Sequence, residues 1–227
     1  MRPALHVCDT ALLQFEDITS YYNSPRKEML PYVPTGASRI LDVGCGTGMF
    51  ALACREATGC ECWGVELVPK VAEQARPRLE QVFAGDANHI LPTLPNEHFD
   101  MISFTDVLEH IAWPEETLRL AKPLLRPGGV VVASLPNIVY WDAIRTMAFK
   151  NDFPYSDSGI FDRTHLRFFT RKSIPRLFDC AGYAVLTLDG INPSHSPKLR
   201  LLNLLTFNRF ADFRWLQYAV VARPTST

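Results

Sequence analysis

The sequence predicts a doubly wound α/β fold, in which a mainly parallel sheet carries helices on both faces. Short apolar runs of strand length alternate with amphipathic stretches of helix length from Arg39 to Leu188. Strands buried on both faces of a sheet have such continuous apolar runs, and the alternation is typical of parallel sheets covered by helices. The chain has 227 residues, of which 47% are hydrophobic. This length suits one compact domain with a large core.

The predicted strands are short apolar runs bounded by turn residues, and the predicted helices have apolar residues three or four positions apart. The strands are Ile40–Val43, Cys62–Val65, Gln81–Phe83, Asp100–Phe104, Val130–Ser134, Tyr183–Leu188 and Gln217–Arg223. The helices are Met49–Ala57, Val68–Arg76, Glu115–Leu120, Ile138–Phe149, Ser173–Ala181 and Leu201–Phe207, and Thr10–Tyr32 is expected to be largely helical.

The overall charge gives no support for a nucleic acid as partner. Twenty-three basic and twenty-four acidic residues leave a formal charge of −1, which gives no general attraction to a nucleic acid backbone. The first fifteen residues contain Asp9 and lack a continuous apolar run, so no secretory signal is expected. The apolar run Ala219–Ala222 is too short to span a bilayer. We therefore expect a cytoplasmic protein without nucleic acid or membrane partners, whose six cysteines are reduced structural thiols.

A glycine-rich turn lies between the first predicted strand and the first helix after it. Gly44, Gly46 and Gly48 allow a ligand to approach the backbone closely. Dinucleotide-binding turns have glycine where this chain has Met49, and Asp42 would repel a pyrophosphate. S-adenosyl-L-methionine (SAM) has no phosphate and carries an ammonium and a sulfonium group. The charge of Asp42 therefore favours SAM over NAD.

Two further acids follow the next two predicted strands. Glu66 is placed to accept hydrogen bonds from ribose hydroxyls, and Asp86 to accept one from an adenine amino group. Together with Asp42, they form a nucleoside cradle without phosphate counter-charges.

These residues lie in motifs that resemble those of class I SAM-dependent methyltransferases. Leu41–Gly48 resembles the first motif of that family, and four later segments resemble its other motifs in order and spacing. They are Val65–Glu66, Gly85–Ala87, Asp106–His110 (with Phe99–Asp100 before it) and Leu124–Gly129. The resemblance implies a Rossmann-like methyltransferase sheet, SAM as cofactor and S-adenosyl-L-homocysteine as product.

The resemblance also implies which residues contact the cofactor. Asp42, Gly44, Cys45, Gly46 and Gly48 would hold the methionine part of SAM. Glu66 would hold the ribose, Asp86 and Ala87 the adenine, and Asp106 would border both donor and acceptor. Tyr22 and Arg26 resemble lid residues that meet the donor's carboxylate, and Leu67 and Val107 complete the expected set.

The domain organisation follows from the same comparison. We expect residues 1–227 to form one methyltransferase domain, with a helical lid at 1–36 and a donor-binding core at 39–135. A substrate cap would occupy 137–171, beside the carboxyl edge of the sheet, and a helical insertion 197–213.

Catalytic candidates are His165, His110 and Asp106. His165 is expected to be a general base because it lies in the cap beside Asp162 and Arg163, either of which would set its tautomer. The alternative is that His165 only hydrogen-bonds the cap to the sheet. Asp106, Glu109 and His110 are also spaced to bind a divalent metal, but we expect none.

The acceptor class is less constrained than the donor. Gly159–Thr170 resembles a bacterial subgroup that modifies glycans or small metabolites, and Asp106–His110 is similar to a pattern in ubiquinone-pathway O-methyltransferases. We expect methyl transfer to a small molecule or saccharide, with oxygen preferred to nitrogen. The alternatives are N-methylation of a small molecule, RNA methylation and a non-catalytic SAM-binding partner of another methyltransferase.

Two segments have alternative interpretations. The basic residues of the cap, from Arg163 to Arg176, would bind an acidic substrate or form an ordinary solvated face. The Leu-rich segment Leu201–Phe207 would be a buried cap, with an interfacial helix or a homodimer contact as alternatives.

Overall fold

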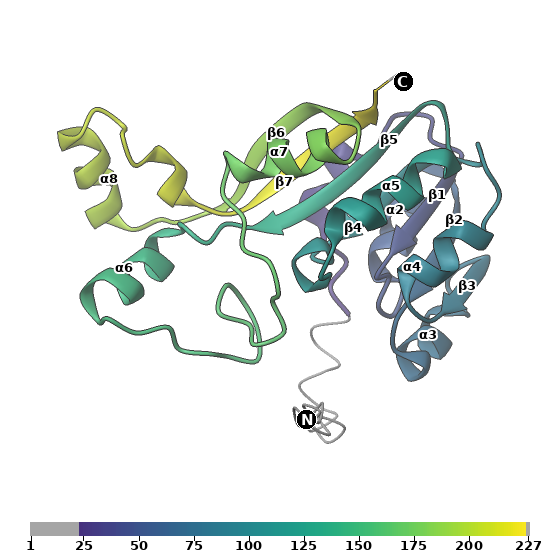
Figure 1. The fold of residues 1–227 in the computed structure, drawn as a ribbon, viewed down its shortest axis with the longest axis horizontal. Coiled ribbons are helices and arrows are strands. Elements are labelled where there is room, and N and C mark those ends of the chain that lie inside the picture. Colours follow the sequence, from purple (N-terminus) through teal and green to yellow (C-terminus); the bar gives the residue numbers. More distant parts are fainter. Residues whose placement is uncertain (1–22, 226–227) are drawn as a thin grey trace, which may run out of the picture.

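The computed structural model describes residues 23–225, which form a sheet with helices on both faces (Figure 1). The strand order is β3-β2-β1-β4-β5-β7-β6, and β7 runs antiparallel to both of its neighbours. The strands are β1 (Arg39–Val43), β2 (Glu61–Glu66), β3 (Gln81–Ala84), β4 (Phe99–Thr105), β5 (Leu125–Pro136), β6 (Tyr183–Pro193) and β7 (Trp215–Pro224). The predicted doubly wound fold is confirmed.

The sheet is parallel from β3 to β5, and the departure from a parallel arrangement is confined to β7, whose direction the sequence did not predict. The connection from β6 to β7 contains α8 (Pro197–Leu205), but this helix projects away and does not cross a face of the sheet (Figure 1). The chain therefore returns beside β6 in the opposite direction, as in a hairpin.

The helices cover two apolar faces. One core cluster contains Leu118 and Phe178, and the other contains Phe50 and Ala72. Alternate residues of β5 point into the two clusters, as the period of a strand requires. The sheet-covering helices are α2 (Met49–Thr58) and α3 (Pro69–Ala75) on one face, and α4 (Ala87–Ile90), α5 (Pro114–Ala121) and α7 (Ser173–Cys180) on the other.

The crevice expected for a ligand in such a fold lies at the carboxyl ends of β1 and β4, which are neighbours in the sheet. From β1 the chain passes through α2 to β2, and from β4 it passes through α5 to β5 on the other side. Open α/β sheets bind ligands at such a switch point, outside the carboxyl ends of the strands. The loops after these two strands carry the glycine turn and Asp106.

Two segments border this crevice. After β5, α6 (Trp141–Phe149) leads into residues 150–172, which contain no helix and only two isolated bridges. Buried Asn137 ties the start of this cap to β7, because its Nδ2 donates to the carbonyl of Trp215 at 2.8 Å. The lid is not an α-helix where it is described. Lys27–Tyr32 forms a 3₁₀ turn that contains Pro31, and Tyr22 lies outside the described residues.

Candidate active site

The glycine turn has backbone conformations that favour glycine. Gly44, Gly46 and Gly48 have φ angles of 72°, 54° and 82°. A Cβ on Gly44 would lie 2.4 Å from Cγ2 of Val107, so a side chain would fill the space between the two loops. The turn is therefore built to keep its backbone accessible and close to the end of β4.

Glu66 joins the turn to the end of β2. Its Oε2 accepts a hydrogen bond from the Gly46 amide at 3.0 Å, and its Oε1 accepts one from the Val68 amide at 2.9 Å. Burial raises the pKa of this carboxyl, because desolvation outweighs the stabilising amides. Each oxygen retains a second lone pair, which suits it to accept from a ribose hydroxyl.

Asp42 lies beneath the turn and is only 1% exposed. Its Oδ1 accepts from the Ser103 hydroxyl at 2.7 Å, whereas its Oδ2 has no hydrogen-bond partner within residues 23–225. Burial raises its pKa to about 7, and the nearby Glu66 adds to this shift. A buried carboxylate oxygen without a partner is costly, so the site favours a ligand that brings positive charge or a donor.

The expected adenine side of the site combines a polar and an apolar residue. Asp86 caps α4, with its Oδ1 accepting from the Asn88 amide at 2.8 Å, and Ala87 begins that helix. Leu67 is 65% exposed although it follows a buried strand. An exposed leucine at this edge offers an apolar surface to a planar base.

Arg26 and Asp106 meet across the mouth of the crevice. Asp106 has a φ of 56° directly after β4, and its Oδ2 forms an ion pair with the Arg26 guanidinium. Its Oδ1 accepts from the Ser134 hydroxyl and from Nε2 of Gln217, both at 2.8 Å. Arg26 therefore binds an acid of the protein in this structure, where the sequence predicted that it would meet the donor's carboxylate.

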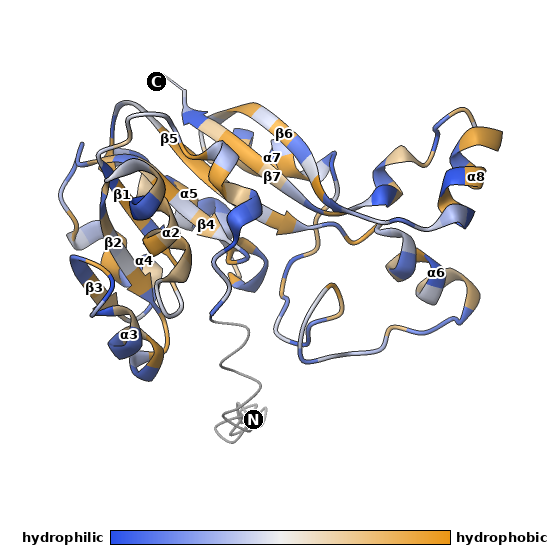
Figure 2. Ribbon diagram, turned by 180° about the vertical axis from the view of Figure 1, so that it is seen from behind, coloured by the Kyte–Doolittle hydropathy of each residue, from blue (hydrophilic) through white to orange (hydrophobic). Residues whose placement is uncertain are grey.

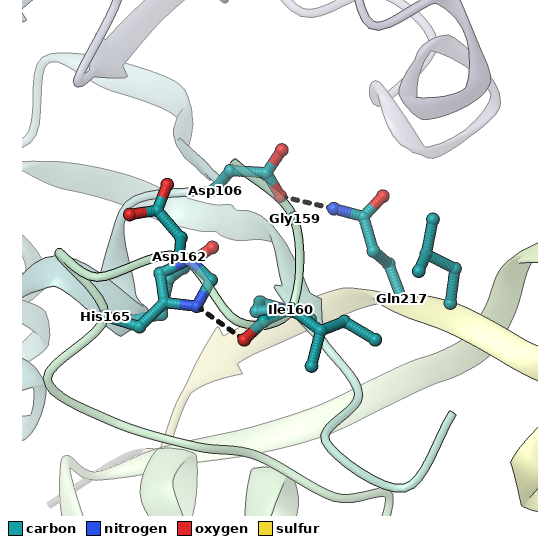
Figure 3. A pocket seen from close by; sticks show the side chains of 9 residues that line it. Asp106, Gly159, Ile160, Asp162, His165 and Gln217 are labelled. Carbon is teal, nitrogen blue, oxygen red and sulfur yellow. Dashed lines mark hydrogen bonds between the residues drawn. The ribbon is translucent and has the colours of Figure 1, made fainter. Parts of the chain in front are cut away.

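A small cavity of about 80 Å³ lies next to Asp106 (Figure 3). It is lined by loop, cap and β7 residues. They are Asp106, Glu109, Pro136, Gly159, Ile160, Asp162, His165, Leu216 and Gln217. The volume is well below the several hundred Å³ of a typical ligand pocket, so only the reacting end of an acceptor fits in this conformation.

His165 belongs to this cavity and has a defined tautomer. Its Nδ1 lies 3.3 Å from the Ile160 carbonyl oxygen, which can only accept, so Nδ1 carries the proton and Nε2 a lone pair. The sequence predicted that Asp162 or Arg163 would set the tautomer of His165, and this prediction is wrong. Asp162 accepts from the backbone and hydroxyl of Thr164, and Arg163 pairs with Asp157. Burial lowers the pKa of His165, so the ring is neutral near pH 7.

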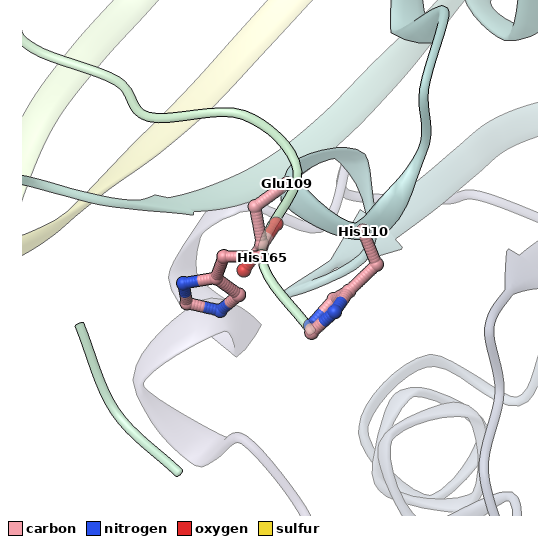
Figure 4. A group of neighbouring side chains, drawn as sticks. All are labelled: Glu109, His110 and His165. Atoms are coloured by element: carbon pink, nitrogen blue, oxygen red, sulfur yellow. The ribbon is translucent and has the colours of Figure 1, made fainter. Parts of the chain in front are cut away.

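Glu109, His110 and His165 form a compact group (Figure 4). The two histidine rings are edge to face with centroids 4.8 Å apart, and burial lowers the pKa of both. Glu109 is 1% exposed, and burial raises its pKa to about 8. One ligand atom from each of the three residues lies within 4.8 Å of the others. Asp106 is not in this group, so the metal alternative expected from sequence spacing is not formed as predicted.

Basic residues of the cap contact other groups of the protein and do not face the cavity. Arg167 donates to the carbonyl of Ala112 and lies over the ring of Trp113, while Arg171 lies 3.7 Å from Asp212. None of the basic cap residues lines the cavity. The interpretation as an ordinary surface is favoured over an acidic-substrate site.

The sequence did not predict the residues whose hydrogen bonds position the acids and the histidine of the site. Ser103, Ser134, Ile160 and Gln217 position Asp42, Asp106 and His165. Gln217 is 111 positions from Asp106 along the chain, and no local pattern relates the two.

Comparison with known proteins agrees with this geometry. A model of the methyltransferase domain family matches residues 15–188, which is more than half of the chain. The chain belongs to this family. Its Rossmann-like sheet is that of a class I SAM-dependent methyltransferase, and SAM is its cofactor.

Individual relatives support the assignment. A ubiquinone biosynthesis O-methyltransferase of Idiomarina loihiensis is 27% identical over 67% of this chain and 64% of its own length. The bifunctional methionine biosynthesis protein MetXA/MetW of Rhodopirellula baltica is 30% identical over 55% of this chain and 20% of its own length. The matches thus span less than two thirds of these relatives. A SAM-dependent methyltransferase from Archaeoglobus fulgidus has the same fold, with a TM-score of 0.70 at 20% identity over 92% of this chain and 98% of its own.

SAM fits the residues of the methyltransferase. The unpaired Oδ2 of Asp42 calls for a cation or donor, the three glycines of the turn leave their backbone open, and exposed Leu67 offers an apolar surface. The expected cofactor set is thus gathered at one edge of the sheet, apart from Tyr22, which is not described.

Glu66→Ala is expected to weaken SAM binding by about tenfold or more, because hydrogen bonds to a charged group contribute roughly 1.5–3 kcal/mol each. Isothermal titration calorimetry measures the change, with Glu73→Ala on the exposed side of α3 as the matched control. Equal affinity in both variants, or binding of NAD in place of SAM, would contradict the assignment.

Glu109→Gln is expected to reduce the loss of stability that occurs as pH rises from about 4.5 to about 8. The folded protein keeps the Glu109 proton up to about pH 8, whereas the unfolded chain releases it near 4.5. Stability therefore falls as pH rises between these values. Urea unfolding at both ends of this range should show a decrease smaller by on the order of 2 kcal/mol in the variant. Exposed Glu116→Gln is the control, and identical pH dependence in all three proteins would disprove the burial effect.

Proposed function

We propose that the protein transfers a methyl group from SAM to a hydroxyl oxygen of a neutral small molecule or saccharide. The observation that carries this proposal is His165, a neutral imidazole in the cavity beside Asp106 with Nδ1 held by the Ile160 carbonyl. A hydroxyl acceptor benefits from such a base, because its proton must leave during attack.

Bound SAM supplies an electrophilic methyl group on a sulfonium. The acceptor oxygen forms a bond to the methyl carbon as the carbon–sulfur bond breaks, which leaves S-adenosyl-L-homocysteine. Nε2 of His165 takes the hydroxyl proton. Much of the rate would come from holding the two reactants in line, which contributes up to roughly 7–11 kcal/mol in well-oriented systems.

The charge of the cavity supports a neutral acceptor. Asp106 and Asp162 line it, and the Arg26 guanidinium is engaged by Asp106. The third acid of the lining, Glu109, has a pKa of about 8 and keeps its proton near pH 7, so it adds no positive charge that would attract an anion. An anionic acceptor would meet carboxylates at short range, whereas hydroxyl groups have acceptors to donate to. The O-methyltransferases among the relatives favour oxygen over nitrogen as the methylated atom.

Methyl transfer from isotope-labelled SAM should appear in a small-molecule or glycan fraction, as an ether-linked methyl group identified by mass spectrometry. RNA and protein fractions serve as parallel acceptors. Label in RNA would support the alternative of an RNA methyltransferase. SAM binding without any product in all fractions would support a non-catalytic SAM-binding protein.

His165→Ala is expected to lower kcat by about 10²- to 10⁴-fold and to leave SAM affinity unchanged. In the wild type, kcat/KM should fall on the acid side with a midpoint below the ordinary histidine value of 6.5, because burial lowers the pKa. This acid limb should disappear in the variant. Exposed His195→Ala is the control. Activity that EDTA abolishes and a divalent ion restores would assign Glu109, His110 and His165 to a metal instead.

A further inference from the structure

The helix α8 presents leucines to solvent. Leu201, Leu204 and Leu205 are 57%, 75% and 69% exposed, and Phe207 just after the helix is 95% exposed. Figures 1 and 2 show α8 at the projecting end of the molecule, away from β3 and the cofactor edge. We call these four residues the α8 apolar face. The expectation of a buried cap is therefore wrong for this part of the segment.

The exposed leucines form one side of α8, and a cation lies at each border of that side. At 100° per residue, Leu201, Leu204 and Leu205 share one side of α8. Leu199, 2% exposed, lies on the opposite side and packs inward. Lys198 and Arg200 flank the leucines, one on each border, and both are exposed. Long basic side chains in this position can extend their charges toward a polar surface above an apolar layer.

The surrounding sequence has no acid to neutralise these cations. Lys198, Arg200 and Arg209 lie in a stretch without Asp or Glu from Gly190 to Ala211. The acids at its two ends are engaged elsewhere: Asp189 accepts from the Tyr32 hydroxyl at 3.3 Å, and Asp212 lies 3.7 Å from Arg171. The sequence around the α8 apolar face is therefore locally cationic, although the net charge of the protein is −1.

We propose that the α8 apolar face binds the surface of an anionic lipid bilayer. Basic residues around an exposed apolar face complement anionic headgroups above an acyl layer. A second copy of the chain fits less well, because a symmetric contact would bring together two patches that both carry the cations Lys198 and Arg200. The association is peripheral, since no helix within residues 23–225 is long and apolar enough to cross a membrane. This inference is independent of the proposed chemistry.

Co-sedimentation with vesicles tests the proposal. The wild type should bind vesicles of phosphatidylcholine and phosphatidylglycerol in equal amounts, and bind pure phosphatidylcholine much less. Leu201→Ser with Leu204→Ser should lower the partition coefficient at least about tenfold. Lys198→Ala and Arg200→Ala should each lower it about fivefold at low salt, and added salt should mimic their effect.

Matched controls separate membrane binding from misfolding and from self-association. Leu186→Ser removes a leucine of similar exposure on β6 and should leave vesicle binding unchanged. SAM calorimetry should give the same affinity for all variants, because α8 lies far from the glycine turn. Equal binding of the leucine variants, no preference for anionic vesicles, or absence of wild-type binding would overturn the proposal. A leucine-dependent dimer in analytical ultracentrifugation, without vesicle binding, would assign the face to self-association.

Discussion

The site depends on the hydrogen bonds that the Glu66 carboxylate accepts from the backbone of Gly46 and Val68. They join the turn after β1 to the end of β2, so the glycine turn is fixed to the strand end where we expect the ribose to bind. Glu66 is only 4% exposed, so its charged form loses most of its hydration, and the hydrogen bonds from these amides offset that cost. The same carboxylate thus organises the empty turn and remains able to accept from a ligand.

A second junction lies at the end of β4, where elements far apart in sequence converge on Asp106. Arg26 comes from the segment before the sheet, Ser134 from β5 and Gln217 from β7. Asp106 therefore connects the lid, the sheet and the wall of the cavity. Any rearrangement that frees Arg26 for a ligand must also change the environment of Asp106, which lines the cavity proposed for the acceptor.

Buried acids dominate the electrostatics of this edge. Asp42 and Glu109 are each 1% exposed and have raised pKa values of about 7 and 8. Proteins accept such costs mainly at functional sites, where a ligand or a catalytic group compensates for them. The acids explain why a cationic donor is favoured on one side and a neutral, hydroxyl-bearing acceptor is proposed on the other.

Local patterns in the sequence determined the alternation of strands and helices, the glycine turn and the acids at the strand ends, because all of these follow from side-chain period and backbone conformation. The antiparallel direction of β7, the pairing of Arg26 with Asp106 and the tautomer of His165 came only from the tertiary structure. The exposure of α8 also came only from the tertiary structure, since a leucine-rich helix can have the same sequence whether other elements cover it or it extends into solvent. The direction of β7 and the Arg26–Asp106 pair depend on contacts between residues far apart in the chain, which no local pattern encodes. The contact between His165 and Ile160 spans only five residues, but it lies in a loop without a repeating pattern from which it could be predicted.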